Sequence, residues 1–158
     1  MKYSDKYDKY FSSDMVESIA KTQGALFSFA EQQQYDMSKF IPLYLKSDFC
    51  NNEMDAIESY FHWKTEGILM SQIEYEQAIP KISNQNKNLY YDVFWMGIMY
   101  RLLVFATGFS SKEIYDIIDA KFMDKYAISL ELCDFDDAVS IILVDIKGKY
   151  NFPACMKN

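Results

Sequence analysis

The feature that most constrains the fold is an apolar run from Val93 to Ala106 that surrounds a single charged residue, Arg101. An α-helix built from this run is apolar on every side, so it must be enclosed by protein or by lipid. The run is shorter than the roughly 18 apolar residues that a membrane span requires, and a guanidinium interrupts it. The sequence therefore predicts a buried central helix, at about residues 89–107, in a compact soluble domain.

Arg101 is the only arginine of the chain, and in so apolar a helix it needs a partner. An unpaired buried charge costs several kcal/mol, so we expect a carboxylate beside it. Gly97, one turn earlier, leaves room for a close neighbour, and we interpret Arg101 as a structural anchor to Glu113 or Asp116 on the next helix. The alternative is an anion-binding or catalytic arginine, but no phosphate-binding glycine loop accompanies it.

Apolar residues also recur at helical spacing in most other parts of the chain. Such stretches begin near Ser13, Met37, Asn51, Thr65, Ser110 and Asp134, and a shorter one lies around Phe122. Residues 140–146 are also compatible with a buried strand, but the acidic start and basic end of their segment favour a helix. Residues 81–88 are polar and predict an exposed loop.

The predicted fold is a single all-α domain over residues 1–158, an irregular bundle of about seven helices. Gly108 is expected to cap the end of the central helix, and Ser110 and Glu113 have the spacing of a capping box at the start of the next one. Aromatic residues within residues 1–12 indicate either an N-terminal helix that packs on the body or a flexible arm that contacts a partner.

The formal net charge of −7 and the isoelectric point near 4.7 disfavour a nucleic-acid or anionic-membrane partner. The turn before Ser111 resembles that of a DNA-reading helix-turn-helix, but the helix after it carries three carboxylates where phosphate would lie. We therefore expect neither direct DNA binding nor membrane association. The partner that we expect is a protein, and the acidic charge is compatible with a basic one.

The acidic residues are concentrated between Ser110 and Asp137, a segment that contains eight of them and only three lysines. The candidate partner-binding residues are Glu113, Asp116, Asp119, Asp124, Asp134, Asp136 and Asp137. Such a cluster is either a solvated face with helix-start carboxylates or an acidic patch that docks on a basic partner or mimics nucleic acid.

The sequence predicts no cofactor and no metal centre. Three widely spaced cysteines and one histidine, His62, provide neither a zinc motif nor a disulfide framework. The first ten residues are polar, so we expect no signal peptide and a cytoplasmic protein. His62 lies in an aromatic cluster, Tyr60–Trp63, which is more typical of a core than of a catalytic site. A small enzyme that uses Arg101 and His62 in a buried pocket is one alternative function, and a phage-type inhibitor that mimics nucleic acid is another.

A family resemblance covers roughly residues 36–147. It rests on two sets of residues. The first is Gly97, Tyr100, Arg101, Thr107, Gly108 and Ser110 to Tyr115, and the second is Phe40, Ile41, Leu45, Ser47 and Cys50 to Asp55. In order and spacing they resemble small all-helical proteins of low-GC Gram-positive bacteria from gene clusters similar to toxin–antitoxin systems.

The resemblance implies an antitoxin or accessory role, without an established activity. The chain departs from the pattern where Leu102 and Leu103 replace expected aromatic residues and where no histidine follows Tyr126. Together, charge and resemblance predict a non-enzymatic cytoplasmic interaction protein that binds a toxin or a defence effector through an acidic surface.

Overall fold

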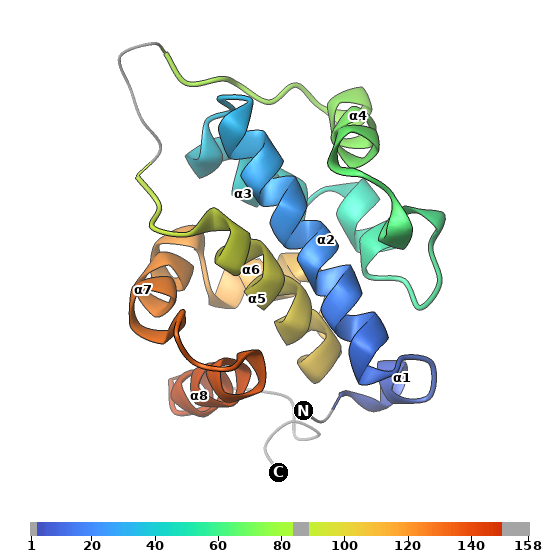
Figure 1. The fold of residues 1–158 in the computed structure, drawn as a ribbon, viewed down its shortest axis with the longest axis vertical. Coiled ribbons are helices and arrows are strands. Elements are labelled where there is room, and N and C mark those ends of the chain that lie inside the picture. Colours follow the sequence, from blue (N-terminus) through green and yellow to red (C-terminus); the bar gives the residue numbers. More distant parts are fainter. Residues whose placement is uncertain (1–2, 84–88, 150–158) are drawn as a thin grey trace.

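The computed structural model describes residues 3–83 and 89–149, and this part of the chain is all-helical (Figure 1). Its elements are α1 (Asp5–Asp8), α2 (Ser13–Gln32), α3 (Met37–Leu45), the π-helical turn η1 (Cys50–Met54), the 3₁₀ turn η2 (Tyr60–Trp63), α4 (Glu66–Glu76), α5 (Val93–Thr107), α6 (Ser111–Ile117), α7 (Ala120–Leu130) and α8 (Phe135–Lys147). Within the described residues the only β-type pairing is an isolated bridge between Tyr35 and Lys81. The predicted all-α bundle around a central helix is confirmed.

Helix α5 forms the centre of the bundle, in contact with α2, α6, α7 and α8 (Figure 1). All of its residues except Phe94 and Ala106 are buried. The helix begins later than predicted because the side chain of Asp92 accepts a hydrogen bond from the backbone N–H of Trp95 (3.0 Å) and so caps it. It ends at Gly108, whose φ of 78° is the left-handed conformation predicted for this position.

The closest helix contact is the crossing of α2 and α5, where a glycine from each helix faces the other. A Cβ added to Gly97 would lie 2.8 Å from the backbone oxygen of Gln23 and 2.9 Å from the Cα of Gly24. A Cβ added to Gly24 would lie 2.8 Å from the backbone oxygen of Phe94. The room that Gly97 was expected to leave is therefore filled by the backbone of α2.

Two predicted segments differ in the structure. The helix expected from Asn51 through Phe61 is replaced by η1 and η2, because the chain leaves the helical path around Asp55, whose carboxylate points into the core. The short piece expected around Phe122 is the complete helix α7. Residues 140–146 lie in α8, so the helix favoured for them over a strand is confirmed. Of the predicted loop at 81–88, residues 84–88 lie outside the described residues.

The N-terminal segment packs on the body and is no flexible arm from Tyr3 onward. Tyr3, Tyr7 and Phe11 are buried, and the ring of Tyr7 meets that of Phe105 edge-on, with centroids 4.8 Å apart. The backbone N–H of Ser4 also donates to the oxygen of Phe105 (3.0 Å). Residues 1–2 of the expected arm lie outside the described residues.

No single helix of the described chain is long and apolar enough to cross a membrane. Taken together, α5 and α6 have sufficient length and apolar composition, but they are bent by 108° at the break between them.

The glycine crossing generates a stability prediction. Gly97→Ala should lower the free energy of unfolding by about 1–3 kcal/mol, because its methyl group would push α2 and α5 apart. Gly67→Ala is the matched control, since a Cβ at Gly67 on α4 meets nothing within 4 Å. The control should gain up to about 1 kcal/mol from helix propensity. Urea denaturation of both variants tests this, and equal stability of the two would contradict the crossing.

Candidate functional site

The polar side chains that the fold brings together most closely form a buried centre, here called the polar centre: Gln23, Asp55, Arg101 and Ser111. Gln23 comes from α2, Asp55 follows η1, Arg101 lies on α5 and Ser111 begins α6. The side chains of Gln23 and Arg101 are completely buried, and those of Asp55 and Ser111 nearly so. Four segments of the chain, from α2 to the start of α6, therefore meet at one ion pair.

Arg101 uses its guanidinium donors within the protein. Nη1 forms an ion pair with Oδ1 of Asp55. Nη2 donates to Oε1 of Gln23 (2.7 Å) and to Oγ of Ser111 (3.2 Å), and Nε donates to the same Gln23 oxygen (3.2 Å). The guanidinium carbon also lies 5.6 Å from the ring centroid of Phe105, within cation–π range.

Asp55 connects this arginine to the start of α6. Its Oδ2 accepts from the backbone N–H of Ser111 (2.7 Å), and its Oδ1 accepts from the hydroxyl of Ser111 (2.6 Å). A carboxylate at a helix N-terminus satisfies a free N–H and complements the helix dipole. The backbone oxygen of Asp55 accepts from the hydroxyl of Tyr7 (2.6 Å), which ties the N-terminal segment to the same point.

Gln23 connects the polar centre to the glycine crossing. Its Nε2 donates to the backbone oxygen of Gly97 (2.8 Å), and its Oε1 accepts from the hydroxyl of Tyr44 (2.7 Å) in addition to Arg101. Both ends of the amide thus have partners, as a buried amide requires.

The electrostatics of the centre favour a fixed ion pair over a reactive group. Burial alone would lower the pKa of Arg101, but Asp55 raises it above its ordinary value, so the guanidinium keeps its proton. Burial, with a contribution from Asp55, raises the pKa of the nearby Cys50 thiol to about 11 and that of Tyr7 to about 12. Neither group is ionised at neutral pH, and Cys50 is no activated nucleophile.

The carboxylate partner of Arg101 is Asp55, which corrects the expectation of Glu113 or Asp116. Glu113 instead forms the predicted capping box with Ser110 at the start of α6. Asp116 pairs on the surface with Lys46, at 3.5 Å. The capping box occupies Glu113 locally, and Ser111, rather than Ser110, turns its side chain toward Arg101.

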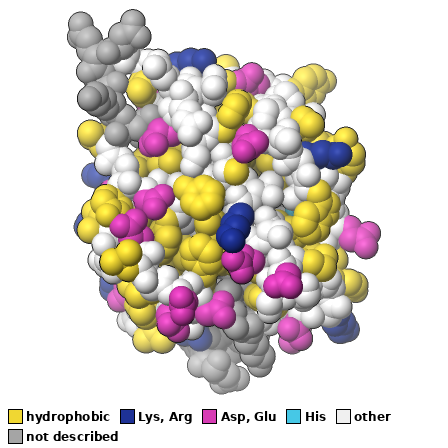
Figure 2. Space-filling model, in the orientation of Figure 1, with side chains coloured by type: hydrophobic (Ala, Val, Ile, Leu, Met, Phe, Trp, Pro, Cys, Tyr) yellow, Lys and Arg dark blue, Asp and Glu magenta, His cyan; other side chains and the backbone are white. Residues whose placement is uncertain are grey.

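The predicted partner-binding carboxylates do not form one patch. Asp119 caps α7 by accepting from the N–H of Phe122, and Asp124 accepts from the N–H of Tyr91. The last three of the predicted set line a single hollow with residues from α2 and the end of α7. This acidic hollow is lined by Glu17, Glu131, Cys133, Asp134, Phe135, Asp136 and Asp137. Figure 2 shows acidic side chains in the lower half of this face, where Figure 1 places α8 and the start of α2.

His62 lies apart from the acidic hollow, in a groove between the N-terminal segment and η2. This aromatic groove is lined by Phe11, Met15, Ile57, Glu58, Ser59, Tyr60, His62 and Trp63. A ring nitrogen of His62, Nε2, lies 3.0 Å from the backbone oxygen of Met54. Burial lowers the pKa of His62 from its ordinary value, so the ring is neutral at neutral pH.

The enzyme alternative required Arg101 and His62 to converge on a pocket. The guanidinium of Arg101 is fully enclosed and paired, so a substrate has no access to it, whereas His62 lines an open groove. Among the described residues, no group of three or more His, Cys, Asp or Glu side chains has the geometry of a metal site.

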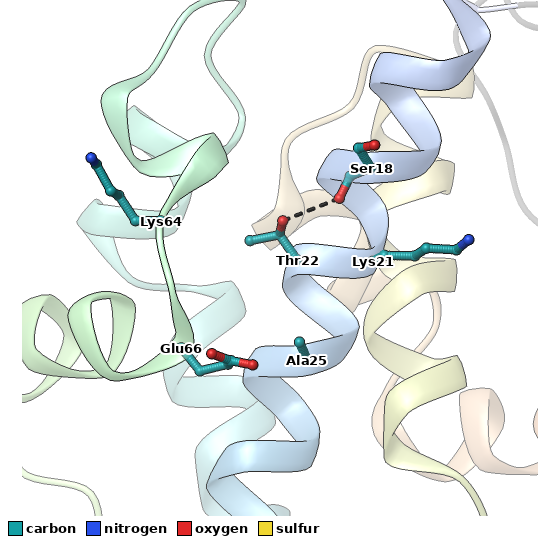
Figure 3. A pocket seen from close by; sticks show the side chains of 6 residues that line it. All are labelled: Ser18, Lys21, Thr22, Ala25, Lys64 and Glu66. Carbon is teal, nitrogen blue, oxygen red and sulfur yellow. Dashed lines mark hydrogen bonds between the residues drawn. The ribbon is translucent and has the colours of Figure 1, made fainter.

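A third hollow lies between α2 and the segment that leads into α4 (Figure 3). Lys21 and Lys64 extend away from each other in this view, and Glu66 is turned toward α2. The hydroxyl of Thr22 donates to the backbone oxygen of Ser18 (3.1 Å). These side chains do not converge on a point, so this hollow offers no binding chemistry.

Sequence reasoning missed Gln23, Asp55 and Ser111 as partners of Arg101. One signal was present: Gln23 occupies a position of α2 that Ile19, Ala20 and Leu26 place on the apolar face, and a polar residue there needs a buried partner. Nothing local distinguishes Asp55 from the other carboxylates of the chain.

The chain matches no protein-family model, and comparisons with curated proteins and with solved structures found no significant match.

The polar centre generates a prediction for Arg101. Arg101→Ala should lower the free energy of unfolding by about 3–5 kcal/mol, because it strands the buried carboxylate of Asp55 and opens a void. Arg101→Met should be milder, because its side chain fills the volume of the aliphatic stem, although it leaves the same carboxylate unpaired.

Lys46→Ala is the control, because it breaks the exposed ion pair with Asp116 and should cost at most about 1 kcal/mol. Thermal and urea denaturation compare the three variants. A stable Arg101→Ala protein would show that the ion pair is dispensable.

The lowered pKa of His62 predicts a pH dependence of stability. The unfolded chain takes up this proton near pH 6.5, whereas the folded protein resists it to a lower pH. Between these values the unfolded state binds more protons, so the melting temperature should fall as the pH decreases from about 6.5. Because His62 is the only histidine, His62→Gln should remove this slope between pH 7 and 5. An unchanged slope would contradict the assignment.

Proposed function

We propose that this chain is a non-enzymatic interaction protein that binds a basic segment of a protein partner in the acidic hollow. The observation that carries the proposal is the convergence of carboxylates from three elements on one concave surface. Glu17 comes from α2, Glu131 follows α7, and three aspartates stand at the start of α8. Among the described residues that line the hollow there is no lysine or arginine.

Helix capping explains only part of this arrangement. Asp136 and Asp137 in the first turn of α8 complement the helix dipole, as many surface aspartates do. Asp134 stands at the N-cap, but its side chain makes no capping hydrogen bond. Glu17 and Glu131 belong to other elements, where Glu17 forms an exposed ion pair with Lys21 (2.8 Å) and Glu131 accepts from the hydroxyl of Tyr91. The stability of α8 does not account for their position at the hollow.

The electrostatics of the hollow suit a lysine-rich or arginine-rich segment. Concave surfaces lined by charge of one sign concentrate the opposite charge and accelerate association. The side chain of Phe135 adds an apolar contact, of the kind that anchors an interface. The resemblance to proteins from toxin-linked gene clusters leads us to propose that the partner is a toxin or a defence effector, with this chain as its antitoxin or accessory protein.

The test compares two double variants of equal charge. Asp134→Lys/Asp137→Lys reverses charge inside the hollow, and Asp8→Lys/Asp48→Lys reverses two exposed aspartates outside it. Calorimetric titration with a lysine-rich helical peptide should show about tenfold weaker binding for the first and less than about threefold for the second. Equal losses of affinity in the two variants would show that only the net charge matters, and this would contradict the proposal. Coexpression with the product of a neighbouring toxin-like gene tests whether this chain is an antitoxin or accessory protein.

A further inference from the structure

The aromatic groove is a second concave surface and shares no lining residue with the acidic hollow. Its volume is about 430 Å³, within the size range of sites for small molecules. Phe11 and His62 are almost fully buried in its wall, whereas the rings of Tyr60 and Trp63 are more than half exposed. Large exposed aromatic surface beside a buried ring is costly to leave in water.

The rings around His62 meet it at steep angles. The ring of Phe11 is inclined by 67° to the imidazole, with centroids 6.2 Å apart, and that of Trp63 by 85°, with centroids 6.5 Å apart. All three rings contribute to the lining of the groove, and of these only the ring of Trp63 is largely exposed. An exposed aromatic face in a groove is a surface on which proteins bind a quaternary ammonium group.

The charges at the groove favour a cation. Glu58 is the one charged side chain among its lining residues, it is exposed, and it has no ion pair within the described part of the chain. The imidazole of His62 is uncharged at neutral pH because burial lowers its pKa, so it does not repel a cation. The negative faces of aromatic rings add to this attraction.

An ammonium group of the chain already lies on one of these rings. The Nζ of Lys64 is 3.9 Å from the ring centroid of Tyr60, the shortest of the cation–ring contacts in the described residues. Lys64 itself does not line the groove. The ring of Tyr60 is therefore already in contact with an ammonium and, edge to face, with the ring of Phe61, which leaves Trp63 as the exposed ring for another cation.

We propose that the aromatic groove binds the quaternary ammonium group of a small molecule, with the cation against Trp63 and beside the carboxylate of Glu58. Met15 and Ile57 supply apolar surface for the methyl groups and an aliphatic stem. This site does not depend on the protein partner proposed for the acidic hollow.

The test uses choline and its uncharged isostere 3,3-dimethyl-1-butanol, which have nearly the same shape. Binding is followed by the NMR signal of the Trp63 indole, with the buried Trp95 as an internal reference. Choline should bind saturably, with a dissociation constant on the order of millimolar, and the isostere should bind at least about tenfold more weakly. Equal binding of the two, or no saturable binding of choline, would overturn the proposal.

Variants separate the site from a general effect of surface aromatics. Trp63→Ala should weaken choline binding by about tenfold and Glu58→Gln by about two- to fivefold. Both side chains are exposed, so their loss leaves the core intact, and unchanged melting temperatures would verify this. Tyr75→Ala, at a fully exposed aromatic on α4 outside the groove, is the matched control and should bind as the wild type does. Unchanged affinity in Trp63→Ala would contradict the site.

Discussion

The ion pair between Arg101 and Asp55 is the interaction on which the rest of the structure depends. Each ion loses several kcal/mol of hydration when it is buried, and their attraction repays this only where other hydrogen bonds complete the site. Gln23 and Ser111 provide those bonds, and they come from α2 and α6, which both contact α5. The pair therefore selects one arrangement of α2, η1, α5 and α6, because any other arrangement leaves a buried charge alone.

The same constraint explains why the chain is irregular around residues 50–59. A continuous helix there would carry Asp55 away from the start of α6, whereas the π-helical turn η1 brings its carboxylate to the backbone N–H of Ser111. The chain departs from regular α-helix at this point, and the departure allows the buried contact of Asp55 to form. Residues quoted for the family resemblance, among them Cys50, Asp55, Arg101 and Ser111, meet in this region, so that motif describes a packing centre.

The ion pair is enclosed, and of the hollows on the described surface two have a distinct chemical character. The acidic hollow between α2, α7 and α8 suits a basic protein segment, and the aromatic groove beside η2 suits a small organic cation. Both include a residue from the start of α2, but they share no lining residue, and the tests of one do not bear on the other.

Much of the fold could be predicted because it rests on local signals: the all-round apolar pattern of α5, the left-handed Gly108, and the capping box of Ser110 and Glu113. The partner of Arg101 could not, because sequence shows the need for a carboxylate but not which one the tertiary structure delivers. The hollow was foreseen only in part, since Asp134, Asp136 and Asp137 are neighbours in sequence whereas Glu17 reaches them through packing.

Native-state hydrogen exchange of the Ser111 amide tests the central claim most directly, because this N–H donates to Asp55 at the point where the four segments meet. If the ion pair holds these segments as one unit, the amide should exchange only through global unfolding, with the same free energy as the core amides of α5 such as Leu103. Exchange at a free energy several kcal/mol lower, while the α5 amides stay protected, would show that α6 opens independently and would contradict the account.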